Sequence, residues 1–297
     1  MMTKFLKCFS LILLGLMMLF QTNLAQKESA HDSIVHKTIP LFSGLHTLSI
    51  HVRDTITHDS VFHFLVDKLK LPVYYYPVTY GKRKYVGVYA GNLVLEPCGP
   101  YTNYLYGTNN FRAIFFGLTF EPFESISQAA IGLANREIHH QVPGDGEIYL
   151  QEDSALCGDN ITISLIDRLD AKINDKRKMD SLRYVMNADT ENELGIEYVK
   201  EICIGYKDCY NLQKWKELIS PLELIDNEIW KENNKLEFHF IKSNIKEVQS
   251  ITFKVKSLEK AKLYLLKNNL FGSFVDNKIQ LNKTQTFGLS IYLTQED

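Results

Sequence analysis

The feature that most constrains the fold of this chain is a repeated order of predicted elements, in which a strand and a helix precede three shorter strands. The first strand, over residues 45–52, alternates two kinds of side chain, as a strand between a core and a cavity does. The apolar face carries Leu48, Ile50 and Val52, and the face that could line a cavity carries Thr47, Ser49 and His51. A helix follows, capped by Asp54 or Thr55. Three strands rich in aromatic and branched residues complete a βαβββ unit by residue 97.

The same order recurs along the chain. Residues 112–122 predict a strand, residues 125–137 a helix and residues 138–166 three shorter strands. Two further units are predicted beyond residue 194, and the charged segment 168–193 between the halves is predicted as a helical linker. The predicted fold class is therefore α+β, with four degenerate βαβββ units paired into two cupped-sheet domains, 40–167 and 194–297.

The first residues are predicted to be a processing segment rather than part of the fold. Lys4 and Lys7 precede a short apolar run, and a small-residue cleavage site ends at Ala25. We therefore expect a signal peptide over 1–25, a loose lead-in over 26–39 and export to the periplasm or outside the cell. An uncleaved anchor is the less favoured alternative, because the run is short for a span of about 20 residues. No second such run follows, so no stable membrane anchor is expected.

The charge and the cysteines narrow the partners. The formal net charge is −2 and the basic residues are dispersed, which argues against nucleic acid and favours a small molecule or a protein. Four cysteines remain after the signal peptide: Cys98, Cys157, Cys203 and Cys209. Disulfides and free thiols both stay open, with free thiols slightly favoured. The sequence contains no nucleophile elbow, phosphate-binding loop or dinucleotide-binding motif.

Several short segments resemble one known superfamily. In the first half they are HVRD at 51–54, LKLPV at 69–73 and YVGVYAGNLVLEPCGP at 85–100. In the second half they are EICIGYKD at 201–208 and VQSITFKVKSLEKA at 248–261. Together they are similar to the vicinal-oxygen-chelate superfamily, which includes glyoxalase I, bleomycin-resistance proteins and extradiol dioxygenases.

That resemblance implies a divalent metal inside each cup, held by residues on the first and last strands of the paired units. Glu96 falls at a last-strand ligand position, but the matching first-strand position is Thr47, with His46 one place off. In the second half Glu201 and His239 fall at such positions, while the remaining ones carry Ser250 and either Ser290 or Tyr292. A divalent metal is possible at Glu96 and His51 or at Glu201 and His239, but the ligand set is incomplete.

The site hypothesis centres on the first cup. We expect Glu96 to act as a general base or a metal ligand and His51 to be its partner. Contacts to the substrate are expected from Thr47, Ser49, Tyr89 and Asn92. The predicted function is binding of a small oxygen-bearing molecule, with lyase or isomerase activity as one option. The alternative is a non-catalytic sequestering module of the bleomycin-resistance type.

Overall fold

The computed structural model describes residues 39–101, 112–144, 146–158, 160–167, 172–188, 194–221, 223–226, 228–231 and 235–296. The predicted signal peptide and all but the last residue of the predicted lead-in lie outside them. Across these ranges, every helix is too short or too polar to cross a membrane.

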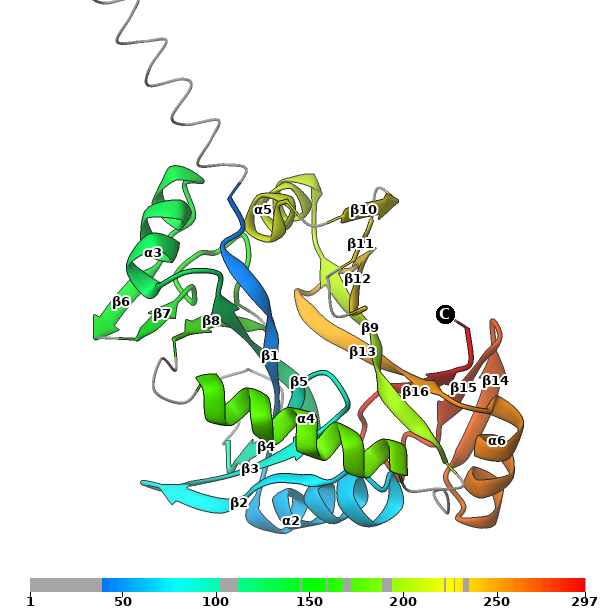
Figure 1. Cartoon of the computed structure of the whole chain (residues 1–297). Helices are drawn as coiled ribbons and strands as arrows, with labels where there is room; N and C mark the ends of the chain where they lie inside the picture. The colour runs from blue at the N-terminus through cyan, green and yellow to red at the C-terminus, as the bar shows by residue number, and fades with distance from the viewer. Residues whose placement is uncertain are drawn as a thin grey trace, which may run out of the picture.

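Two mixed eight-stranded sheets make up the protein (Figure 1). The first has the strand order β2-β3-β4-β1-β5-β8-β7-β6. Its strands are β1 (Phe42–Val52), β2 (Val73–Tyr80), β3 (Arg83–Tyr89), β4 (Val94–Gly99), β5 (Ala113–Pro122), β6 (Gln141–Gly144), β7 (Glu147–Tyr149) and β8 (Thr162–Ile166). Its helices are α2 (Thr55–His63), which continues into the π-helical turn η1 (Phe64–Lys68), and α3 (Ile126–Asn135).

The second sheet has the matching order β10-β11-β12-β9-β13-β16-β15-β14. Its strands are β9 (Ile196–Tyr206), β10 (Glu223–Asp226), β11 (Ile229–Lys231), β12 (Glu237–Lys242), β13 (Glu247–Val255), β14 (Phe271–Val275), β15 (Lys278–Leu281) and β16 (Ile291–Thr294). Its helices are α5 (Cys209–Ile219) and α6 (Leu258–Lys267). In both sheets two long antiparallel strands, β1 with β5 and β9 with β13, form the centre.

Helix starts follow the sequence closely. The Asp54 carboxylate accepts a hydrogen bond from the Thr57 amide at 2.7 Å, and Ser257 caps α6 through the Lys260 amide at 3.3 Å. Strand ends differ more from expectation. The sequence predicts a strand from residue 137 after α3, two strands over 221–225 and 235–242 after α5, and a last strand from residue 287. In the structure the first of these begins only at Gln141 and the last only at Ile291, and β11 lies between the middle two.

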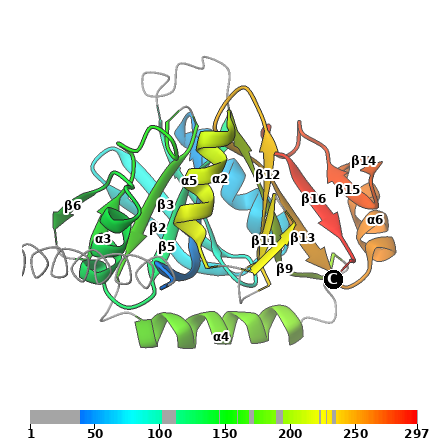
Figure 2. The same cartoon turned by 90° about the horizontal axis from the view of Figure 1, so that it is seen from above.

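The linker contains one long helix, α4 (Lys172–Ala188), which runs alongside both sheets (Figure 2). The halves also touch directly. The Asn92 side chain donates to the Val199 carbonyl at 2.9 Å and accepts from the Val199 amide at 3.0 Å. The Lys214 ammonium donates to the carbonyls of Arg136 and Glu137, both at 3.1 Å. The two sheets are therefore joined by polar contacts as well as by the linker.

All four described cysteines carry free thiols. Cys98 and Cys157 are buried, Cys203 is half-buried and Cys209 is exposed. Burial raises the pKa of the Cys157 thiol to about 12. These buried thiols therefore stay protonated and unreactive at neutral pH.

Candidate functional site

An opening with a volume of about 530 Å³ lies in the second sheet. We call it the second cup. It is lined by Glu201, Cys203, His239, Ile241, Glu247, Gln249, Ser250, Thr252, Val275, Asp276, Lys278, Lys283, Ser290 and Tyr292. Hydroxyl, amide and charged groups thus outnumber apolar ones, as suits a small polar ligand.

Strand alternation places these side chains. On β9, Ile202 and Ile204 are fully buried in the core, and Glu201 and Cys203 point the other way into the cup. The pairing of β13 with β9 shifts between Val248 and Ser250. An extra residue in one strand turns neighbouring side chains to the same side. Gln249 and Ser250 therefore both line the cup despite being adjacent.

A carboxylate and an ammonium form an ion pair inside the cup. The Lys278 Nζ lies 2.5 Å from Glu201 Oε2, and the Thr252 hydroxyl donates to the same oxygen at 3.0 Å. Burial alone would raise the pKa of Glu201, but the hydrogen bond and charge of Lys278 outweigh burial, so the pKa is lowered. Glu201 is therefore ionised at neutral pH.

The predicted pair Glu201 and His239 does come together, with Glu237 as a third residue. Their ligand atoms lie within 4.8 Å of one another, and two carboxylates with an imidazole suit a divalent metal. The fit is incomplete, because Lys278 binds Glu201 and the Lys231 ammonium lies 3.6 Å from Glu237. The charge of both carboxylates is already balanced, so we derive no step through a metal here.

The first cup is occupied by the protein's own side chains. Glu96 accepts hydrogen bonds from the Ser49 hydroxyl at 3.2 Å and from the Tyr75 hydroxyl. The His51 ring stacks between Tyr101 and Phe116, with ring centroids 3.7 and 4.0 Å away. Stacking at this spacing leaves no room for a ligand on either face of the imidazole.

The electrostatics of the first cup do not suit proton transfer through His51. Burial, reinforced by the nearby charge of Arg83, lowers the pKa of His51 to about 3. Burial also raises the pKa of Cys98 and Tyr101. The Arg83 guanidinium lies 4.4 Å from the Tyr101 ring centroid. His51 is therefore neutral at physiological pH, which does not favour proton transfer through it. Its role as partner of Glu96 stays a prediction.

The other predicted substrate contacts are engaged elsewhere. Thr47 bonds through its hydroxyl to His46 Nδ1 at 2.7 Å, and the Tyr89 hydroxyl donates to the Gly91 carbonyl. Asn92 uses its amide to join the two halves through Val199. Thr47 and Ser49 share the cup-facing side of β1. The hydrogen bonds of Tyr89 and Asn92 given above go to neither Glu96 nor His51. Substrate binding by these residues stays a prediction.

Sequence reasoning missed Lys278 and Glu237. Lys278 lies on a short hairpin strand, and its partner Glu201 is 77 residues away in the chain, so no local pattern connects them. Glu237 carries a weak signal, because it lies two residues before His239 on β12 and therefore on the same face.

No family model matches the chain, and no curated protein matches its sequence. Solved structures do match. A homoprotocatechuate 2,3-dioxygenase variant from B. fuscum aligns with a TM-score of 0.53 at 11% identity, covering 88% of this chain and 73% of that one. A 4-hydroxymandelate synthase mutant from Streptomyces coelicolor aligns at 0.53 and 11%, covering 85% and 92%. The 2,3-dioxygenase LapB from Pseudomonas sp. KL28 aligns at 0.51 and 8%, covering 86% and 93%.

These similarities define a fold class. The chain shares the two-sheet fold of these dioxygenases and of the synthase. Identities of this size show the fold and not the chemistry. The particular resemblance to glyoxalase I and bleomycin-resistance proteins stays a prediction.

Proposed function

We propose that this protein binds a small oxygen-bearing molecule in the second cup. The observation that carries the proposal is an open polar cavity of about 530 Å³ that contains the Glu201–Lys278 ion pair. A buried ion pair next to open space offers both a hydrogen-bond acceptor and a cation to an incoming ligand. In the first cup the carboxylate and the imidazole are engaged by protein side chains, and the cation, Arg83, lies against the Tyr101 ring.

The lining of the cup indicates the chemistry of the ligand. Hydroxyls of Ser250, Ser290 and Tyr292 and the amide of Gln249 line the cavity, and such groups bind hydroxyl or carbonyl oxygens. The Lys278 ammonium favours an anionic oxygen such as a carboxylate or a phenolate. Homoprotocatechuate, named for the dioxygenase of similar fold, is a catechol with a carboxylate and is a suitable first probe.

Catalysis at the same place is the second candidate function, favoured by the same ion pair. Lys278 would polarise a ligand oxygen, and the Glu201 carboxylate would accept a proton from the neighbouring atom, as a lyase or isomerase requires. The lowered pKa of Glu201 makes it a weak base, so binding is the better supported function. No observation favours a sequestering role of the bleomycin-resistance type over binding of a small molecule in general.

Three further proposals concern the architecture. We infer that each half consists of two copies of one βαβββ unit, supported by the matching element and strand orders of the two sheets. We propose domain boundaries at 40–167 and 194–297 with the linker between them. Export through residues 1–25 is proposed from their sequence alone, and detection of a chain beginning near Gln26 in a culture would support it.

Ligand-observed NMR on the purified protein tests the proposed function. The probes are homoprotocatechuate, simple catechols and 2-hydroxy acids, with wild type compared to Lys278→Met and Glu96→Gln. We expect Lys278→Met to weaken binding about 10- to 100-fold, the equivalent of a charged hydrogen bond of about 1.5–3 kcal/mol. Glu96→Gln should leave binding unchanged. Binding of none of the probes, or binding that depends on Glu96 and not on Lys278, would contradict the proposal.

A further inference from the structure

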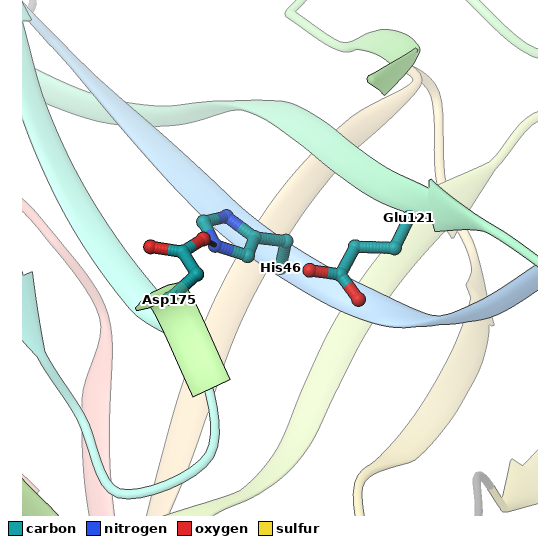
Figure 3. Close-up of side chains that lie close together, drawn as sticks. All are labelled: His46, Glu121 and Asp175. Carbon is teal, nitrogen blue, oxygen red and sulfur yellow. Dashed lines mark hydrogen bonds and ion pairs between the residues drawn. The ribbon is translucent and has the colours of Figure 1, made fainter. Parts of the chain in front are cut away.

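Three metal-ligand side chains converge from three separate elements where α4 meets the first sheet (Figure 3). His46 comes from β1, Glu121 from the end of β5 and Asp175 from the first turn of α4. Their ligand atoms all lie within 4.8 Å of one another. None of these three residues lines the second cup.

The spacing suits a small cation. His46 Nε2 lies 3.0 Å from Asp175 Oδ2, a little less than the ~3.4 Å that separates two ligands each about 2.1 Å from a tetrahedral ion. His46 is buried, and the Asp175 side chain is only 15% exposed. Little rearrangement would bring the three ligand atoms onto one ion.

The orientation of His46 is also set in advance. Its Nδ1 lies 2.7 Å from the Thr47 hydroxyl oxygen. Because an ionised carboxylate can only accept, the 3.0 Å contact between Nε2 and Asp175 has its proton on Nε2. A bound metal would take the place of that proton, and the neutral ring would then carry its proton on Nδ1 and donate it to the Thr47 oxygen. Histidines that bind metals are commonly held in this way through their second ring nitrogen.

The charge balance favours a bound cation. Within the described ranges, Glu121 has no hydrogen bond or ion pair, and Asp175 is bonded only to His46. The nearby Lys178 ammonium lies 4.6 Å from the Tyr74 ring centroid and pairs with neither carboxylate. The cluster in the second cup differs, because two lysines balance its carboxylates. Two close carboxylates without a cation repel each other.

We propose that His46, Glu121 and Asp175 bind one divalent transition-metal ion, which holds the linker helix α4 onto the first sheet. One imidazole and two carboxylates suit zinc or manganese, with water completing the coordination. At its other end α4 is attached by the buried Met186 and by a 3.3 Å hydrogen bond from Arg183 to the Gly91 carbonyl. Near the start of the helix the contact between His46 and Asp175 already joins α4 to β1, and the metal would strengthen this attachment by adding Glu121 to it.

The test measures zinc binding and helix docking separately. The purified full-length chain, stripped with EDTA, is titrated with zinc sulfate by calorimetry, and trypsin cleavage after the exposed Lys176 and Arg177 is followed with and without zinc. We expect one zinc ion per α4 site and slower cleavage when zinc is bound. Asp175→Ala and Glu121→Gln should each weaken zinc binding at least about tenfold and abolish the protection.

Two control variants locate the ion. Asp180→Ala removes an exposed carboxylate from the same helix, one that pairs with Arg183, and should leave the affinity and the stoichiometry of zinc binding unchanged. His239→Ala removes the imidazole of the second-cup cluster and should leave the zinc-dependent protection of α4 intact. Absence of stoichiometric zinc, or zinc binding lost in His239→Ala and retained in Asp175→Ala, would overturn the proposal. Both ligand variants alter partly exposed side chains, so folding is checked by urea unfolding of the metal-free forms.

Discussion

Replacing Lys278 by Met should destabilise the protein, because it leaves the Glu201 carboxylate charged without its ammonium partner. The Glu201 side chain is 10% exposed and that of Lys278 27% exposed. Exposed pairs contribute ~0.2–1 kcal/mol, while breaking a fully buried pair costs ~3–5 kcal/mol. For this intermediate geometry we expect a loss of about 2 kcal/mol in the free energy of unfolding at neutral pH.

The loss should depend on pH in a defined direction. In the wild type the pKa of Glu201 lies below its ordinary value of 4.5, so the stability from this group is present above about pH 4.5 and falls as pH drops through the folded pKa. Without Lys278, burial should raise the pKa of Glu201, and protonation then relieves the penalty. The difference between the two proteins should therefore begin to shrink as pH falls through the raised pKa of Glu201 in the variant, above about 4.5, and should go on shrinking down to the lowered pKa of the wild type.

Urea unfolding of a double-variant cycle measures the effect. The set is wild type, Lys278→Met, Glu201→Gln and the double variant, each at about pH 7 and about pH 4. The double variant should recover most of the stability lost in Lys278→Met, because no unpaired charge remains. If Lys278→Met loses the same free energy at both pH values and the two substitutions are additive, the reasoning is refuted.

Three further predictions follow from burial and hydrogen bonding. Burial lowers the pKa of His51 to about 3, so its contribution to the free energy of unfolding is complete above its unfolded pKa of about 6.5 and is lost as pH falls towards 3. His51→Phe should therefore flatten the dependence of stability on pH between these two values. An unchanged pH dependence would refute the prediction. A thiol reagent should label the exposed Cys209 within minutes and Cys98 and Cys157 only on unfolding; equal rates would contradict the burial. Asn92→Ala removes two hydrogen bonds to Val199 and should cost about 1–3 kcal/mol in urea unfolding, while the control Asn187→Ala, on the exposed side of α4, should cost little.

Much of the fold could be predicted because its signals are local. The alternation along β1 and the Asp54 cap depend on residues within one element, and the structure has both. The strand β11 (Ile229–Lys231) was missed because three residues are too few to show a period. The order of elements repeats along the chain, so the pairing of the strands could be anticipated from the superfamily resemblance as well.

The site was harder to predict because it depends on contacts between distant segments. A sequence cannot tell aromatic rings that line a cavity from rings that fill it, as Tyr101 and Phe116 do around His51. No local pattern singles out Lys278 or Asp175, since their partners Glu201 and His46 are 77 and 129 residues away in the chain. Only the folded chain brings these charges together.

A crystal structure of the protein with bound homoprotocatechuate tests the central claim most directly. The account predicts the ligand in the second cup, with one of its oxygen atoms within hydrogen-bonding distance of Lys278 Nζ. A ligand bound in the first cup against Glu96, with the second cup empty at saturating concentration, would contradict it.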